Sequence, residues 1–235
     1  MGHSPELTGV KRFIWKNGEQ RDIIANNLKK YFPDAKIVIF LRNQIDFLTS
    51  VYIYYVKKGG TITPSKIIDM MIEKKLEFGL DFLKYSELLE TYYNLFGKNN
   101  VHVYLFEEFV TNRKTFIQKF TKLYGFDVNE IDIDFNPVND KLRLNLLKIL
   151  RVTNKFTKKD NPLKKYYFHI PFLYNILNEK QYILNNWNIF GRKTITNDLF
   201  RQDQIDYINN YYKESNRDLI EKYGISDIEK FNYSI

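Results

Sequence analysis

Arg42 and Ser50 are the residues whose types and spacing point most directly to a binding site. Arg42 stands immediately after a short apolar run, residues 36–41 (KIVIFL), where the polarity of the chain changes abruptly. Its guanidinium carries a permanent charge on a planar fork of N–H donors, which matches the oxygens of a phosphate. Ser50 follows eight residues later, about two turns along a helix, so its hydroxyl can point back towards the same space. Together the two side chains can hold one phosphate from two sides.

The same two residues also permit a purely structural interpretation. An arginine at the end of a strand often pairs with a nearby acid, and a serine in a helix often has no specific role. From spacing alone, both interpretations stay open.

A buried strand and a helix must position this pair. Residues 36–41 are β-branched and almost wholly apolar, which is typical of a parallel strand buried on both faces. The next segment predicts a helix with an apolar stripe, and we expect it to end at Gly59–Gly60. The stripe consists of Ile45, Leu48, Tyr52 and Val56. In an open α/β sheet, ligands bind beyond the carboxyl ends of the strands, which is where Arg42 stands.

The order of the remaining elements predicts an α/β protein. A second buried strand is expected at residues 101–106 (VHVYLF), and a long helical segment separates it from the first. This order is typical of a parallel sheet flanked by helices. We expect one domain over residues 1–235, with an α/β core portion in 1–134 and a mostly helical portion in 135–235. Helices are predicted at residues 19–31, 82–96, 112–124, 142–156, 173–184 and 202–223.

The composition limits the classes of partner and cofactor. The 235 residues include 36 Lys or Arg and 28 Asp or Glu, so the net charge is +8; this favours an anionic partner or reflects A/T-rich codons. The chain has no cysteine, and its three histidines lie far apart, so we expect no metal site. No apolar run approaches the ~18 residues that cross a bilayer. We therefore expect no transmembrane segment and, since Met1 begins no signal peptide, a cytoplasmic location.

Residues 36–50 (KIVIFLRNQIDFLTS) resemble the 3′-phosphate-binding signature of sulfotransferases that use 3′-phosphoadenylyl sulfate (PAPS). That signature is an apolar strand, then Arg-Asn-(Pro or Gln)-x-Asp, then a Ser eight residues after the Arg. Gln44 replaces the commoner Pro, and the continuation from Tyr54 to Gly60 resembles one bacterial branch of the family. Two later blocks resemble the same family in the expected order. They are residues 99–126, with Phe106 and Glu107 before a helix, and residues 211–224, with Ser-Asn-Arg-x-Leu in a terminal helix.

The resemblance implies a parallel sheet like that of P-loop NTPases, with a largely helical C-terminal half. It implies transfer of a sulfuryl group from PAPS, without a metal, to a hydroxyl or amine of a small-molecule or glycan acceptor, with a carbohydrate expected. Arg42 and Ser50 would hold the 3′-phosphate. Arg192 and Lys193, which follow Gly191, would add a second basic contact, unless they form a plain surface loop.

One part of the family pattern is missing from the sequence. Family members begin with a strand and a Gly-Thr/Ser-Thr loop around the 5′-phosphosulfate, whereas Met1 comes after that place. We therefore expect the first strand and phosphate loop to be absent, in a fragment of a longer enzyme or in an inactive remnant that acts as an interaction protein. The cluster Gly59–Thr63 is better explained as the end of a helix.

The catalytic base is expected near the start of the chain. Residues 3–9 (HSPELTG) resemble a Ser-x-Glu-x-Leu-x-Gly stretch of the family, which makes Glu6 the candidate base and His3 the alternative. From the sequence alone, a solvated charge near a terminus is the simpler explanation of Glu6.

A basic nucleic-acid-binding protein is the alternative from another class. Its basic side chains should form a stripe on one face and bind in a salt-sensitive way. The Lys and Arg residues are scattered among nearly as many acids and form no known nucleic-acid motif. We therefore expect a nucleotide co-substrate as partner, with no nucleic acid. The acceptor and the oligomeric state are not fixed by the sequence.

Overall fold

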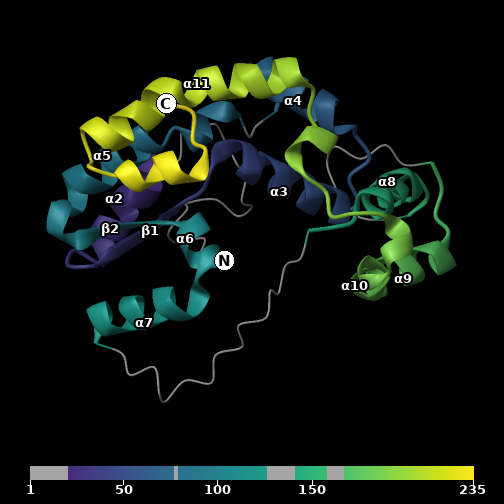
Figure 1. Ribbon diagram of the computed structural model, residues 1–235, viewed down its shortest axis with the longest axis horizontal. Helices are drawn as coiled ribbons and strands as arrows, with labels where there is room; N and C mark the ends of the chain where they lie inside the picture. Colours follow the sequence, from purple (N-terminus) through teal and green to yellow (C-terminus); the bar gives the residue numbers. More distant parts are fainter. Residues whose placement is uncertain (1–20, 77–78, 126–140, 158–166) are drawn as a thin grey trace. The chain divides into compact units, whose positions relative to one another are not determined.

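The computed structural model describes residues 21–76, 79–125, 141–157 and 167–235 (Figure 1). The chain divides into two compact units, each assembled from separate stretches of sequence. The sheet unit comprises residues 1–44, 74–137 and 208–235, and the helical unit comprises residues 45–73 and 138–207.

Two short parallel strands form the centre of the sheet unit (Figure 1). β1 (Ile37–Leu41) pairs with β2 (Val101–Leu105) in the register Ile37↔Val101 to Leu41↔Leu105. The last residues of both strands, Leu41 and Leu105, are buried. Two helices of this unit, α2 and α5, pack against each other, and α5 also contacts both strands. The other elements of the unit are α2 (Arg21–Tyr31), η1 (Leu80–Leu83), α5 (Tyr85–Phe96), η2 (Lys98–Asn100), α6 (Phe106–Thr111), α7 (Arg113–Tyr124), η7 (Ser226–Phe231) and residues 208–221 of α11 (Gln202–Glu221).

Aromatic side chains connect α7 to the strands. The Phe116 ring lies 5.7 Å from that of Phe40 and 5.3 Å from that of Tyr104, between ring centroids. The side chain of Asn112 caps α7 by accepting a hydrogen bond from the Thr115 amide. Gly125, with φ of 75°, ends the helix in the left-handed conformation that glycine adopts without a steric penalty.

The helical unit contains the helix that carries Ser50. Its elements are α3 (Gln44–Lys57), α4 (Pro64–Ile72), α8 (Leu144–Thr153), η4 (Asn154–Phe156), α9 (Pro171–Glu179), α10 (Gln181–Asn186), η5 (Asn188–Phe190), η6 (Thr196–Asp198) and residues 202–207 of α11. Backbone bonds from Leu144 to Arg192 and from Thr194 to Leu142 join the start of α8 to the loop after η5. This loop is the one that contains the predicted Arg192–Lys193 pair.

The end of α3 confirms that Gly59–Gly60 stop the helix. Gly59 has φ of 93°, and a Cβ atom on Gly60 would lie 2.2 Å from the Tyr55 ring. The Tyr55 hydroxyl accepts hydrogen bonds from the backbone amides of Thr61 and Ile62. The glycines therefore let the chain turn tightly against an aromatic ring of its own helix.

The α/β class is confirmed: the described residues form a small parallel sheet and many helices. The expected strands and most of the expected helices are present. β1 is not buried on both faces as expected, because Val38 and Phe40 are exposed, and two helices differ in detail. Residues 173–184 were predicted as one helix and form two, because the chain turns at Lys180, which is the C-cap of α9 and the N-cap of α10. Residues 82–84 lie in a 3₁₀ turn and its cap before α5 begins at Tyr85. No helix among the described residues is long and apolar enough to cross a membrane.

We predict that Asn154→Ala destabilises the chain by about 2 kcal/mol. The side-chain amide of Asn154 is buried and donates to the carbonyls of Val56 and Gly60, at 2.8 and 2.9 Å. The substitution leaves both carbonyls, at the end of α3, without this donor. Urea unfolding of the variant measures the loss, with the exposed Asn197→Ala as matched control. Equal stability of the two variants would show that α3 does not depend on this contact.

Candidate functional site

Arg42 lies directly beyond the paired ends of the two strands. Leu41 and Leu105 are register partners, so Arg42 and Phe106 are the first residues past the sheet on neighbouring strands. The guanidinium carbon of Arg42 lies 4.6 Å from the centroid of the Phe106 ring. A planar cation at this distance from an aromatic face is held electrostatically and by stacking. Phe106 therefore supports the face of the Arg42 guanidinium, and the guanidinium keeps its charge.

The backbone of Arg42 is fixed by a buried tyrosine. The Tyr85 hydroxyl, at the start of α5, donates to the Arg42 carbonyl at 2.7 Å. Tyr85 is buried, and burial raises the pKa of its hydroxyl above the ordinary value. The hydroxyl therefore stays protonated and keeps donating.

Asn43 joins the end of β1 to the end of β2 and to the C-terminal segment. Its backbone amide donates to Oε1 of Glu107 at 2.8 Å. Its side-chain amide donates to the carbonyls of Phe231 and Asn232, at 3.3 and 2.8 Å. The other carboxylate oxygen of Glu107 accepts a hydrogen bond from the Tyr233 hydroxyl at 3.3 Å. The turn after Arg42 is thus tied to two separate segments of the chain.

Gln44 extends this network to α11. Its Nε2 donates to Oδ1 of Asn216 at 2.6 Å, and Nδ2 of Asn216 donates to the Ser234 carbonyl at 2.9 Å. Asn216 is completely buried. Next to it, Ser215 is hydrogen-bonded to Ser86 of α5 at 3.0 Å. The three blocks singled out in the sequence, around Arg42, Phe106–Glu107 and Ser215–Asn216, therefore meet in the sheet unit.

The guanidinium of Arg42 is available to an anion. It forms no ion pair with the carboxylate of any described residue. The half-buried acid of this region, Glu107, is bonded to Asn43 and Tyr233. Arg42 thus differs from Arg21, whose guanidinium donates to the carbonyls of η1 and is used structurally.

Ser50 lies in the second turn of α3, in the helical unit, and is partly exposed. Gln44, the first residue of α3, follows Arg42 by two residues. A helical rise of 1.5 Å per residue separates Gln44 and Ser50 by about 9 Å along the axis. Binding of one phosphate by Arg42 and Ser50 together stays a prediction.

The loop with Arg192 and Lys193 packs against the same turns of α3. The Thr196 hydroxyl is hydrogen-bonded to the buried Thr49 hydroxyl at 2.9 Å and lies 3.4 Å from Oδ1 of Asp46. This contact places the end of the loop beside the residue that precedes Ser50. The contribution of Arg192 and Lys193 to a phosphate site stays a prediction.

Arg192 has a structural partner within this loop. Its guanidinium forms a bidentate pair with Asp198, and Asp198 also accepts a hydrogen bond from the Ile195 amide. Lys193 takes part in an antiparallel bridge with Arg143. The side chain of Arg192 is 58% exposed, so Asp198 covers only part of it.

Glu6 and His3, the candidate bases, lie outside the described residues. Their roles stay predictions.

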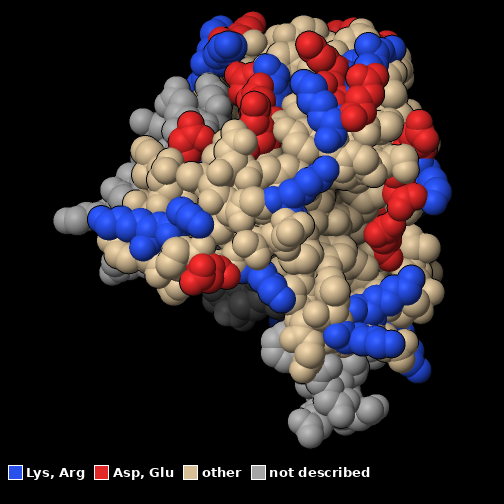
Figure 2. Space-filling view, turned by 90° about the vertical axis from the view of Figure 1, so that its left-hand side faces the viewer, with Lys and Arg blue, Asp and Glu red and all other residues tan. Residues whose placement is uncertain are grey.

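Basic and acidic side chains are mixed on the face drawn in Figure 2. Among the described residues on that face, Lys and Arg are interrupted repeatedly by Asp and Glu. Such a surface does not offer the continuous basic stripe that a nucleic-acid backbone would require.

Comparisons with known proteins identify the family. A family model described as "Sulfotransferase domain" matches residues 23–218, which is most of the chain. The chain therefore belongs to the sulfotransferase domain family. Among solved structures, a sulfotransferase from Alicyclobacillus acidocaldarius is similar at 18% sequence identity, with a TM-score of 0.43. The match covers 73% of this chain and 63% of that one, less than two thirds of its length. No curated protein matches the chain.

The sequence did not reveal the residues that hold Arg42 in place. Phe106 and Tyr85 contact Arg42 from segments far away in the chain, and Tyr233 holds Glu107, the acceptor of the Asn43 amide. The register that makes Phe106 a neighbour of Arg42 is a property of the folded sheet. The roles of the two tyrosines likewise had no signal in the sequence.

We predict that the chain loses stability above about pH 10. Burial, and for Tyr233 also the Glu107 carboxylate, raises the pKa of Tyr85 and Tyr233 in the folded state. In the unfolded state both tyrosines ionise near pH 10. Their contribution is therefore fully present below that pH and is lost as the pH rises towards the folded pKa, by up to about 1.4 kcal/mol per pH unit for each tyrosine.

Urea unfolding at a series of pH values from about 8 to 11 measures this loss. Tyr85→Phe removes one of the two ionisations, so the stability of this variant should fall less steeply as the pH rises. The variant also loses about 1 kcal/mol of stability at neutral pH, because it lacks the hydrogen bond of the hydroxyl. The exposed Tyr31→Phe is the matched control. An unchanged alkaline slope in Tyr85→Phe would contradict the assignment.

Proposed function

We propose that this protein transfers a sulfuryl group from PAPS to a hydroxyl or amine of an acceptor, and that Arg42 binds the 3′-phosphate of PAPS. The observation that carries the proposal is the Phe106-supported guanidinium at the carboxyl end of a parallel strand, which forms no ion pair with a described residue. Membership of the sulfotransferase family supports the reaction class.

The rigidity of the Arg42 turn favours binding of a phosphate. The peptide bond that follows Arg42 is fixed at both of its polar atoms, since Tyr85 donates to the Arg42 carbonyl and the Asn43 amide donates to Glu107. A donor that is already held in place loses little conformational freedom when it binds. A charged hydrogen bond of this kind contributes about 1.5–3 kcal/mol, and two parallel bonds from one guanidinium add orientation.

We propose that Ser50 binds the same phosphate and that Arg192 and Lys193 form a second basic contact to it. The contact between Thr196 and Thr49 supports this, because it attaches the loop to the turn of α3 that leads to Ser50. For Arg192, phosphate binding requires the guanidinium to be shared with Asp198 or released from it.

In the proposed reaction, the bond between sulfur and the bridging oxygen of the 5′-phosphosulfate breaks while sulfur bonds to the acceptor oxygen or nitrogen. The acceptor gives its proton to a base, and adenosine 3′,5′-bisphosphate leaves. We propose Glu6 as that base, with His3 as the alternative. The described residues contribute binding and orientation of the nucleotide, which is where most of the catalysis of such transfers resides. A carbohydrate is the proposed acceptor because tyrosine, present 18 times, is suited to stacking on sugar faces.

We predict that adenosine 3′,5′-bisphosphate raises the melting temperature of the chain and that Arg42→Ala weakens this binding roughly 10- to 150-fold. Removing the guanidinium removes the charged donors to the 3′-phosphate. Differential scanning fluorimetry and calorimetric titration measure the two effects. The exposed Arg217→Ala, which removes a cation from α11 of the same unit, is the matched control.

Adenosine 5′-monophosphate separates 3′-phosphate recognition from general nucleotide binding. It lacks the 3′-phosphate, so Arg42→Ala should leave its weaker affinity almost unchanged. The proposal fails if the wild-type chain binds the bisphosphate no better than the monophosphate, or if Arg42→Ala weakens both equally.

We predict that Ser50→Ala weakens bisphosphate binding by a smaller factor, about 3- to 10-fold. If Ser50 and Arg42 bind one phosphate, the double variant should lose less than the sum of the two single losses in free energy. Calorimetric titration of the four proteins gives the coupling. Strict additivity would show that the two side chains act at separate places.

A further inference from the structure

Exposed apolar side chains are concentrated in one part of the helical unit. Among the described residues, 21 large apolar side chains are exposed, and eleven of them lie between residues 149 and 195. These eleven define what we call the aromatic–basic surface: Ile149, Val152, Tyr167, Phe168, Ile170, Phe172, Tyr182, Ile183, Trp187, Ile189 and Ile195. Phe172 and Ile189 are 74% and 80% exposed. Isolated exposed apolar residues are common, but a concentration of this kind marks an interaction site.

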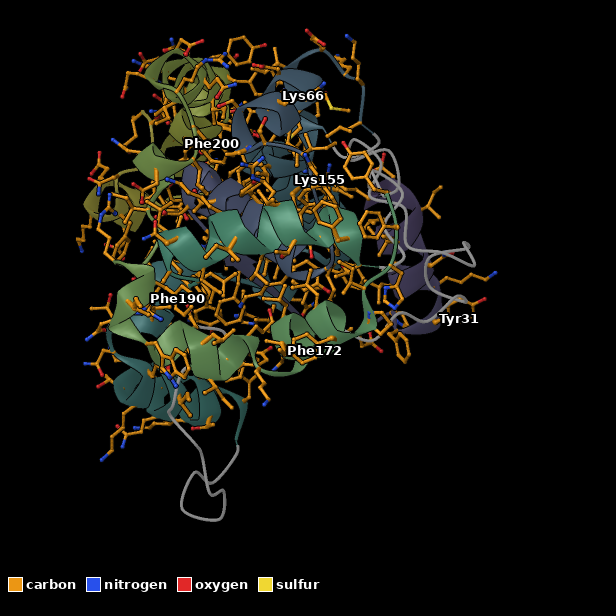
Figure 3. The ribbon with its side chains drawn as sticks, turned by 90° about the vertical axis from the view of Figure 1, so that its right-hand side faces the viewer. Tyr31, Lys66, Lys155, Phe172, Phe190 and Phe200 are labelled. Atoms are coloured by element: carbon orange, nitrogen blue, oxygen red, sulfur yellow. The ribbon has the colours of Figure 1, made fainter. Side chains whose placement is uncertain are left out.

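The elements that carry this surface contact one another. α8 contacts η5, and α10 contacts both α9 and η5. The Phe156 ring, after α8, lies 5.2 Å from the Phe168 ring, and Lys57 of α3 lies 5.7 Å from the Tyr182 ring. Figure 3 looks onto this part of the chain, with Lys155, Phe172 and Phe190 labelled. The exposed side chains therefore belong to one packed group of helices.

The same stretch carries the excess positive charge of the whole protein. Residues 141–195 contain twelve Lys or Arg and two Asp or Glu, whereas the rest of the chain contains 24 and 26. Several of the twelve are engaged within the fold: Arg143 donates to the carbonyls of Asn185 and Gly191, Arg192 pairs with Asp198, and Lys141 pairs with Asp46. Others, including Lys148 and Lys180, are exposed between the apolar side chains.

We propose that the aromatic–basic surface docks on an anionic lipid bilayer. Trp, Tyr and Phe rings beside aliphatic side chains are suited to the boundary between headgroups and acyl chains, and lysines next to them attract anionic headgroups. A nucleic acid would engage the lysines but would leave Phe172, Ile183 and Ile189 in water. An acidic protein would likewise bind the lysines through their charge. An anionic bilayer matches both features of this surface, because its headgroups attract the lysines and its acyl chains accept the exposed apolar side chains.

Vesicle flotation tests the proposal directly on the full chain. Vesicles of phosphatidylcholine with added phosphatidylglycerol should carry the protein to the top of the gradient, and vesicles of phosphatidylcholine alone should carry much less. The protein has two tryptophans, Trp15 and Trp187. In a Trp15→Phe background the emission therefore reports on Trp187 alone, which should shift to the blue on anionic vesicles and be quenched by brominated acyl chains.

Two double variants separate the contributions of apolar contact and charge. Phe172→Ser with Ile189→Ser should reduce partitioning into anionic vesicles at least tenfold and abolish quenching by brominated chains. Lys148→Glu with Lys180→Glu should reduce partitioning into anionic vesicles by a similar factor and make this partitioning less dependent on salt. Val110→Ser with Leu123→Ser, at exposed apolar positions of the sheet unit, is the matched control. Unchanged melting temperatures show that the variants are folded.

Three results would overturn the proposal. The first is failure of the wild-type chain to bind anionic vesicles, and the second is equal binding by the Phe172/Ile189 variant and the control. The third is binding to DNA, RNA or a second copy of the chain that Phe172→Ser with Ile189→Ser abolishes, without blue shift or quenching of Trp187 on vesicles. None of the residues substituted in these variants is proposed to bind the bisphosphate, so bisphosphate binding and vesicle binding are tested independently.

Discussion

The hydrogen bond from the Asn43 amide to Glu107 is the interaction on which the organisation of the site depends. It joins the ends of two parallel strands at the point where both chains leave the sheet, and parallel strands offer no hairpin to make that connection. The same carboxylate accepts from Tyr233, and the Asn43 side chain reaches the carbonyls of Phe231 and Asn232. Glu107 and Asn43 thus join the ends of both strands and the C-terminal segment at a single turn.

This arrangement explains why the acid of the region does not neutralise the arginine. Glu107 is occupied by a backbone amide and a buried hydroxyl, while the Arg42 guanidinium rests on Phe106. An arginine paired with a carboxylate has to give up that partner before it binds an anion. Stacking on a ring supports the cation without using its N–H donors.

Local sequence patterns predicted the helices and strands, whereas contacts between distant parts of the chain determine the geometry of the site. The two strands and the stop of α3 follow from short-range features: an apolar run bounded by polar residues, and a glycine pair. Arg42 was placed correctly at the end of its strand because that position is a property of the sequence around it. Glu107, Asn216 and Asn232 were not predictable partners of the Arg42–Gln44 turn, because their contacts with it join residues 64, 172 and 189 positions apart. The break at Lys180 was missed because residues on both sides share helical spacing.

The C-terminal segment of the chain closes over the turn that carries Arg42. The carbonyls of Phe231 and Asn232 receive the Asn43 side chain, the Ser234 carbonyl receives Asn216, and Asn232 adopts a left-handed conformation with φ of 56°. An affinity tag fused after Ile235, or removal of the last few residues, would therefore act on the geometry of Arg42 from the far end of the polypeptide. An affinity tag on this protein should therefore be placed away from the segment around residues 231–235.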